Sequence, residues 1–135
     1  MTDARNRVRA SFAAQGLMRT LGAELTMIGD GEVAIEAPLS PAITQQRGAA
    51  HGGAVFSLAD SAAGYAALTV LPDEAEVATA EMKINFLAPA DGALRATGRV
   101  VKAGRRLIVV TAEVRSGDVL VAVAQGTMIA VPREA

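Results

Sequence analysis

The stretch RGAAHGGAVFSLADSAAG, residues 47–64, places a histidine and two glycines just before an apolar segment that carries one carboxylate. Gly52 and Gly53 leave backbone N–H groups unobstructed at the positive end of the helix that we expect to begin there. Such a helix start can bind an anion or a developing oxyanion, or it can be a flexible junction between loop and helix. His51, the only histidine of the chain, could orient this loop or take part in chemistry.

The carboxylate, Asp60, lies in the middle of the apolar segment. Burying an unpaired carboxylate costs several kcal/mol, so a buried Asp needs dedicated partners. Asp60 must therefore face a cleft or an interface, or have such partners. Gly64 lies one turn further on, where glycine costs a helix about 0.8–1 kcal/mol relative to alanine. It indicates a close approach by a ligand, or close packing of another strand or helix.

The elements around these residues are predicted from their patterns. Residues 53–69 are apolar on all sides and contain no proline, which predicts a long helix buried in the core. Residues 4–21 show a rough apolar stripe and predict an N-terminal helix, weakened by Gly16. Between the two helices, the alternation before and after residues 29–31 predicts a hairpin. A sheet is expected to curl around the buried helix.

After the long helix the sequence predicts strands. Apolar and polar residues alternate over 78–86, with a period of two. Turns at 90–92, 102–104 and 116–118 separate four strand-like segments, which predicts antiparallel neighbours in chain order. The last segment, 119–131, is apolar on both faces, so self-association or the N-terminal helix should cover its second face.

Composition limits the class of protein. The chain has 135 residues, of which 51% are apolar, and its three Phe, one Tyr and no Trp predict an aliphatic core in one domain. A net charge of −1 argues against nucleic-acid binding, and no apolar run reaches the roughly 18 residues of a membrane span. One histidine, no cysteine and no Asp/Glu cluster argue against a metal site. The absence of cysteine and of a secretory signal is consistent with a cytoplasmic protein.

One family shares these motifs. HGGAVFSLAD, preceded by QQRG and followed by TAEMKINFLAPA, resembles the acyl-CoA thioesterases of the hotdog fold, specifically the phenylacetate-degradation type with its HGG-(x)6-D element. The likeness spans roughly residues 15–131. It implies an α+β hotdog fold, an antiparallel β-sheet wrapped around one long central helix, about 53–69, with an N-terminal helix. We expect one such domain over residues 1–135, with 1–14 and 132–135 as peripheral segments.

The resemblance also implies an activity, the hydrolysis of an acyl-CoA thioester to a free acid and coenzyme A. Asp60 would be the catalytic carboxylate, acting as general base or as nucleophile. The N–H of Gly52 would polarise the thioester carbonyl, and the amide of Gln45 would hold the thioester or the water. His51 would support the loop. No cofactor is expected, because coenzyme A is part of the substrate.

Relatives also carry a catalytic hydroxyl in one of two places. One place lies four residues after the carboxylate, where this chain has Gly64. The other lies early in the following strand and matches Thr79. By strict alternation, Thr79 points away from the face that carries Met82 and Phe86, so its role requires a local irregularity or a subunit boundary.

The spacing of Gly52 and Asp60 bears on assembly. They are eight residues apart, about 12 Å along one helix, which is too far for one thioester carbonyl to contact both. The two groups should therefore come from two subunits. The resemblance implies the same, a homodimer or a homotetramer made of two dimers, with active sites at the dimer interface.

The remaining expectations concern substrate binding. Arg105 and Arg106 are candidates to hold the phosphates of coenzyme A, although basic residues at a strand turn are often only solvated. Phe56 could line the acyl pocket or pack in the core, and Gly53 and Gly64 would allow a close approach of the substrate. The alternative function is a hotdog module that binds acyl-CoA without hydrolysis.

Overall fold

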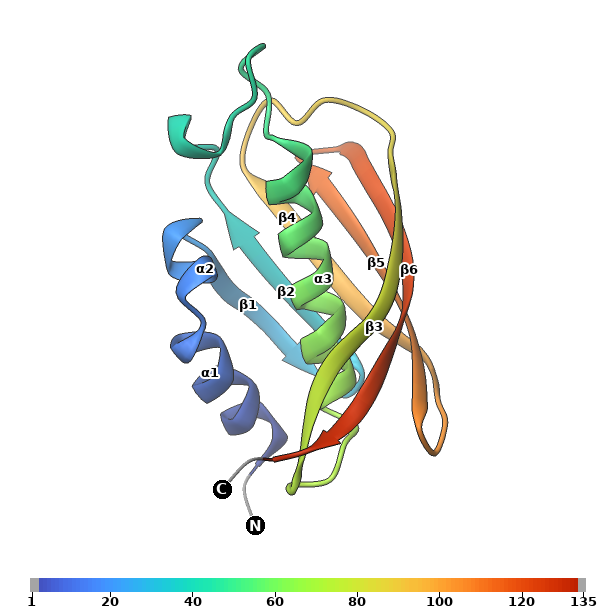
Figure 1. Ribbon diagram of the computed structural model, residues 1–135. Helices are drawn as coiled ribbons and strands as arrows, with labels where there is room; N and C mark the ends of the chain where they lie inside the picture. Colours follow the sequence, from blue (N-terminus) through green and yellow to red (C-terminus); the bar gives the residue numbers. More distant parts are fainter. Residues whose placement is uncertain (1–2, 134–135) are drawn as a thin grey trace.

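The computed structural model describes residues 3–133 of the chain. Its helices and strands follow in the order α1 (Ala4–Ala14), α2 (Gly16–Thr20), β1 (Glu24–Gly29), β2 (Glu32–Ala37), a 3-10 turn (Pro41–Ile43), α3 (Gly52–Leu68), β3 (Ala75–Phe86), β4 (Leu94–Ala103), β5 (Leu107–Ser116) and β6 (Val119–Pro132). The strands form one antiparallel sheet in the order β1-β2-β4-β5-β6-β3. Figure 1 shows this sheet curving around α3. The expected sheet around one long helix is confirmed.

A glycine sets the distance between α3 and the sheet. A side chain at Gly98, on β4, would overlap the backbone of Ala62 and Ala63 on α3. The helix backbone therefore rests directly on the strand, which only glycine permits here. Ala59, Ala62 and Ala63 are fully buried, in agreement with the small side chains that such close packing requires.

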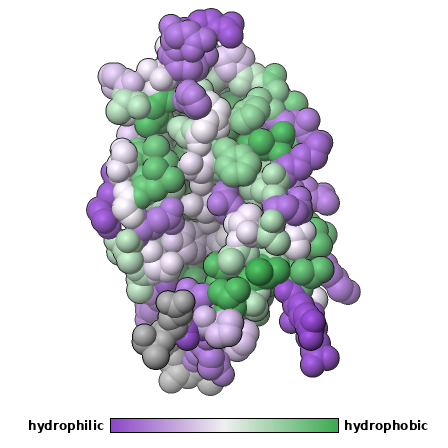
Figure 2. Space-filling view, viewed as in Figure 1, coloured by the Kyte–Doolittle hydropathy of each residue, from purple (hydrophilic) through white to green (hydrophobic). Residues whose placement is uncertain are grey.

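One side of α3 is not covered by its own protomer. The C-terminal half of the helix is buried from Ala62 through Leu68. Beyond the helix start at Gly52, four residues are only half-buried, and we call them the open stripe: Phe56, Ser57, Asp60 and Ser61. In Figure 2, viewed as in Figure 1, pale side chains run along the middle of this face between more hydrophobic margins. The expectation of a helix buried on all sides is therefore wrong along this stripe.

The N-terminal region forms two helices instead of the single helix predicted over 4–21. The backbone at Gln15 is extended, with φ −83° and ψ 109°, and it ends α1 and begins α2. Val8 and Met18 are fully buried, so these helices belong to the core and are not peripheral. α1 packs on β1, α2 and α3, beside β1 in Figure 1, so it does not provide the cover predicted for the last strand. Residues 1–2 and 134–135 lie outside the described residues.

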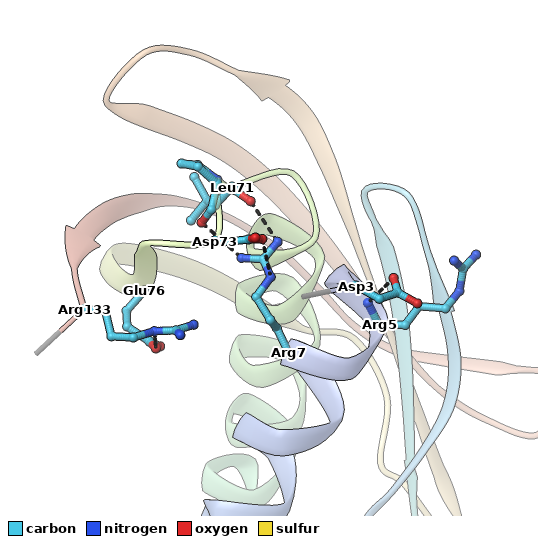
Figure 3. A network of polar contacts seen from close by, with 8 residues as sticks. Asp3, Arg5, Arg7, Leu71, Asp73, Glu76 and Arg133 are labelled. Atoms are coloured by element: carbon cyan, nitrogen blue, oxygen red, sulfur yellow. Dashed lines mark hydrogen bonds and ion pairs between the residues drawn. The ribbon is translucent and has the colours of Figure 1, made fainter. Parts of the chain in front are cut away.

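A buried arginine fixes α1 to the loop between α3 and β3, as Figure 3 shows. The guanidinium of Arg7 donates to the carbonyl oxygens of Leu71 and Pro72, at 2.9 and 3.1 Å. Its Nε lies 3.5 Å from the carboxylate of Asp73, an ion-pair distance. Because the Arg7 side chain is only 6% exposed, these contacts are shielded from water and hold α1 firmly in place.

The strand order corrects the prediction of neighbours in chain order. β3 does not pair with β4; it pairs with β6, while β4 pairs with β2. The connection over residues 87–93 is not a tight turn. Leu87 donates to the carbonyl of Val121, and Ala90 accepts from Ala50, so this connection crosses the end of the sheet near the start of α3. The crossing places β3 at a free sheet edge, on the other side of α3 from β1.

Candidate functional site

The start of α3 leaves one backbone donor free. His51 is the N-cap, and its Nδ1 accepts from Gly53 N–H at 2.7 Å. The N–H groups of Ala54 and Val55 donate to the His51 carbonyl. Among residues 3–133 no group accepts from Gly52 N–H, so this donor is available to a ligand. An Nδ1 that accepts places the ring hydrogen of neutral His51 on Nε2.

Both glycines of the pair lie close to neighbouring side chains, which would have to shift if either glycine carried a Cβ atom. A Cβ atom on Gly52 would lie 3.2 Å from Cζ of Phe86, and one on Gly53 would lie 3.0 Å from Nδ1 of His51. The backbone here is packed between an aromatic ring and an imidazole. This packing argues against the alternative of a flexible junction. The contact between Phe86 and Gly52 joins the end of β3 to the start of α3 and had no signal in the sequence.

Gln45 lies in the same pocket as Gly52. The pocket has a volume of about 570 Å³, and Gln45, Gly52, Val55 and Phe86 are among its lining residues. The side-chain oxygen of Gln45 accepts from the N–H of Arg47 at 2.6 Å. This contact holds the amide oxygen, and the amide nitrogen of Gln45 has no acceptor among residues 3–133. The structure thus brings together two of the predicted site residues in one protomer.

Asp60 has a partner on the neighbouring strand. The hydroxyl of Thr79 donates to Asp60 Oδ1 at 2.7 Å and lies 3.3 Å from Sδ of Met128. A hydroxyl has one hydrogen, and the carboxylate is the stronger acceptor. The second carboxylate oxygen, Oδ2, has no protein partner among residues 3–133. It is therefore free to accept a proton.

A β-bulge brings Thr79 to this position. The register of β3 against β6 shifts between Thr79 and Glu81. Val77 packs against the core before the shift, and Met82 and Ile84 do so after it. Strict alternation would turn Thr79 away from the Met82 face, but the extra residue reverses the alternation, so the local irregularity that a role for Thr79 required is present. The signal in the sequence was Val77, an apolar residue out of phase with the apolar residues from Met82 onward.

Of the other residues predicted to contact the substrate, Phe56 and Gly53 are at least partly exposed, whereas Gly64 is buried. Phe56 is half-buried in the open stripe, next to Asp60 along the helix. Gly53 is exposed at the helix start. Gly64 is buried, and a Cβ atom there would meet Cε of Met128 at 3.9 Å. The structure does not bring Gly64 to the open stripe.

Arg105 and Arg106 are exposed in the hairpin between β4 and β5. In Figure 1 this hairpin lies at the lower right, whereas α3 begins at the top. Within one protomer, these two cations and Gly52 lie at opposite ends of the sheet. Their proposed contact with phosphate stays a prediction, and in an assembly it would involve the site of another protomer.

Residues 3–133 contain no group of three or more His, Asp or Glu side chains able to hold a metal ion. None of their helices has the length and apolar character needed to cross a membrane.

Comparisons with known proteins show which proteins share this fold and sequence. A thioesterase family protein of Silicibacter pomeroyi is 40% identical, with a TM-score of 0.92, and the match covers 96% of this chain and 99% of that one. A Saccharolobus solfataricus protein that bears a provisional esterase name is 34% identical, over 78% of this chain and 75% of its own.

The E. coli PaaI protein, from the phenylacetic acid degradation operon, superposes with a TM-score of 0.87 over 96% of this chain and 94% of that one. Its identity is 22%, so this likeness shows the fold alone. The fold is thus the hotdog fold that the sequence predicted. The family model of the Thioesterase superfamily matches residues 47–123, which include the helix start, Asp60 and Thr79. The chain belongs to the thioesterase superfamily.

Proposed function

We propose that this protein is an acyl-CoA thioesterase that hydrolyses an acyl-CoA to a free acid and coenzyme A. The observation that carries the proposal is the pairing of two features in the matched region. One is the unpaired N–H of Gly52 at a capped helix start, and the other is Asp60, held by Thr79 on the open stripe. An oxyanion donor and a positioned carboxylate are the two groups that thioester hydrolysis needs most.

The reaction follows from these groups. Water attacks the thioester carbonyl carbon while Asp60 Oδ2 takes one of its protons, and Gly52 N–H stabilises the oxyanion that forms. The carbon–sulfur bond then breaks, and the coenzyme A thiolate takes up the proton that Asp60 holds. If Asp60 instead attacks the carbonyl itself, a mixed anhydride forms and coenzyme A leaves as the thiolate. Water then hydrolyses the anhydride to the free acid and the Asp60 carboxylate, and the thiolate takes up the proton that this step releases. In both routes the bond from Thr79 orients the carboxylate.

The site needs two protomers. Gly52 and Asp60 lie on one regular helix, Gly52–Leu68, and are about 12 Å apart along its axis. A partner could bring its own Gly52 to the open stripe. Two surfaces support such a partner: the free edge of β3, and the apolar Phe86 and Leu87, each 54% exposed. A two-fold axis would create two equivalent sites.

Several finer assignments belong to the same proposal. Gln45 donates from its free amide nitrogen to the thioester oxygen or the water. Arg105 and Arg106 contact coenzyme A phosphates bound at another protomer's site. The acyl-CoA type of substrate rests on the resemblance and on the superfamily. A cytoplasmic location rests on the absence of cysteine.

A thiol-release assay tests the proposal. Wild-type protein is incubated with short-chain, medium-chain and aromatic acyl-CoAs, beside Asp60→Asn and the matched control Asp30→Asn in the β1–β2 turn. We expect hydrolysis by the wild type and by Asp30→Asn, and a loss of about 100-fold or more in Asp60→Asn. Binding calorimetry with the same acyl-CoAs tests the alternative function, a module that binds acyl-CoA without hydrolysing it. Tight binding without thiol release would favour a non-catalytic acyl-CoA module.

A further inference from the structure

The bulge in β3 is held by the neighbouring strand β6, which runs beside it in Figure 1. Thr79 pairs with Met128 and Glu81 pairs with Thr127, so Ala80 is the extra residue that has no partner on β6. The hydroxyl of Thr127 donates to the carboxylate of Glu81 at 2.8 Å. Sδ of Met128 lies 3.3 Å from the hydroxyl of Thr79. β6 thus contacts the residues on both sides of Ala80.

Gly126, which precedes these two residues of β6, has no space for a side chain. A Cβ atom there would lie 2.5 Å from the carbonyl oxygen of Glu81 and 3.1 Å from Cα of Met82. Because both atoms belong to the backbone, no rotation of a side chain relieves these contacts, and one of the two strands would have to move. The φ angle of Gly126 is not positive, so its backbone conformation does not by itself require glycine.

The crowding at Gly126 comes from the bulge. In a regular antiparallel pair, facing Cβ atoms stand about 4.5–5.5 Å apart, so an alanine is normally accommodated opposite another residue. The carbonyl that crowds Gly126 belongs to Glu81, the residue that directly follows the extra residue Ala80. Glycine at position 126 is therefore the condition under which the bulge fits between the two strands.

The direction of Thr79 depends on this fit. With a side chain at position 126, the bulge could not stay directly after Thr79 and Ala80. The preceding part of β3 would then slip by one position along β6 or separate from it. A slip of one residue exchanges the two faces of a strand, so the Thr79 hydroxyl would leave Asp60.

We propose that Gly126 is a positioning residue for thioester hydrolysis, because it admits the bulge that aims the Thr79 hydroxyl at Asp60. This inference rests on the proposed thioesterase activity. A misplacement of about 1 Å at a reacting group can cost about 100-fold in rate. Gly126 acts on the orientation of the carboxylate and not on substrate binding, so its replacement should lower kcat and leave KM nearly unchanged.

The first test compares Gly126→Ala with Gly29→Ala, a matched change in strand β1. A Cβ atom on Gly29 would lie 3.7 Å from the nearest atom, the carbonyl oxygen of Glu32, which is an ordinary contact. We expect Gly126→Ala to lower kcat for thiol release from acyl-CoAs about tenfold or more, and Gly29→Ala to keep the wild-type value. In a Thr79→Val background, Gly126→Ala should add less than about a twofold loss, because the bond that it disturbs is already gone.

The second test relieves the crowding without changing position 126. Deleting Ala80 returns β3 to regular pairing, in which Thr79 still faces α3 and the carbonyl of Glu81 moves away from β6 position 126. The deletion alone should fold. Added to Gly126→Ala, it should raise both Tm and kcat above those of Gly126→Ala. This comparison holds even if Gly126→Ala does not fold by itself, because the deletion should then restore folding.

Several results would overturn the inference and leave the proposed activity standing. They are an unchanged kcat in Gly126→Ala, an equal loss with and without Thr79→Val, and no recovery when Ala80 is deleted. An Ala80 deletion that does not fold would also overturn it, because regular pairing would then be unavailable. If wild-type protein releases no thiol from any acyl-CoA, the proposed activity fails, and the positioning role fails with it.

Discussion

The hydroxyl of Thr79 and the carboxylate of Asp60 are joined by a hydrogen bond of 2.7 Å that links β3 to α3. The bond is between residues 19 positions apart, and it exists because the bulge after Thr79 turns this side chain toward the helix. It occupies Oδ1 and leaves Oδ2 for the reaction. The geometry of the carboxylate therefore depends on an irregularity in a strand.

Replacing Thr79 by valine should therefore slow the chemical step. A hydrogen bond to a charged group contributes about 1.5–3 kcal/mol, so we expect kcat to fall roughly 10- to 100-fold with a small change in KM. Thr79→Ser keeps the hydroxyl and should retain most of the activity. In an Asp60→Asn background, Thr79→Val should add little further loss, because both changes disable one unit. A full additional loss in the double variant would show that Thr79 acts independently of Asp60.

Mixing two inactive variants should restore activity if each site uses two protomers. Asp60→Asn and Gly52→Val are each expected to be inactive. In a mixed dimer one site combines the intact Gly52 of one protomer with the intact Asp60 of its partner. Random exchange should give about a quarter of the wild-type rate, since half of the dimers are mixed and half of their sites are intact. Unfolding and refolding the variants together, then measuring thiol release, checks this. No recovery in confirmed mixed dimers would place the whole site in one protomer.

A methyl group at position 52 should be harmful because of Phe86. The ring lies 3.2 Å from the place of the new Cβ, so Gly52→Ala must displace the ring or the helix start. Moving an oxyanion donor should lower kcat by about tenfold or more. Phe86→Leu in the same chain removes the Cζ atom and should restore part of the loss.

Gly16→Ala is the matched control for this change. A Cβ atom there would lie 3.7 Å from the Arg19 side chain, an ordinary contact. We expect unchanged kcat and a stability within about 1 kcal/mol of the wild type. Equal kcat for Gly52→Ala and the wild type would argue against the role given to the helix start.

Arg7 should contribute far more to stability than a surface arginine. Arg7→Met leaves the Leu71 carbonyl without its donor in a shielded place, whereas the Pro72 carbonyl still accepts from the N–H of Ala75. The ion pair with Asp73 is lost as well, and we expect a loss of about 2–4 kcal/mol in the free energy of unfolding. For a domain of this size that lowers Tm by about 5–15 °C. Arg133→Met breaks the exposed pair with Glu76 that Figure 3 also shows, and it should cost less than about 1 kcal/mol. Calorimetric unfolding gives the Tm of each variant. Similar Tm values would contradict the role of Arg7 in holding α1 to the loop between α3 and β3.

Local patterns in the sequence predicted the elements well. The apolar segment around Asp60 gave the central helix to within one residue at each end, because helix propensity and burial agree there. The hairpin with its turn at residues 29–31 was also predicted correctly, because its signal lies in neighbouring residues of the sequence. The break at Gln15 was not predicted, because Gly16 indicates a weakened helix but not the position at which the helix ends. Patterns of this kind depend on near neighbours along the chain, which a sequence shows directly.

Long-range arrangements were predicted less well. The predicted strand order was wrong because the connection over 87–93 is short enough to suggest a turn. Nothing in the local sequence shows that it crosses the end of the sheet near the start of α3. The site was predicted in its members but not in its contacts. The bond from Thr79 depends on a bulge, and the need for glycine at position 52 depends on Phe86, 34 positions away.

The pairing of β3 with β6 also decides when the site can form during synthesis. β3 ends at Phe86, but its partner strand begins only at Val119 and runs to Pro132. Until β6 has left the ribosome, β3 has no neighbouring strand in the sheet. Met128 of β6, which contacts Thr79, is also not yet in place. A nascent chain that ends before β6 thus already holds Gly52, Asp60 and Thr79 and still lacks the framework that aligns them. Folding of the candidate site therefore follows translation of β6, and the exposed β3 is the segment that a chaperone would have to shield in the interval.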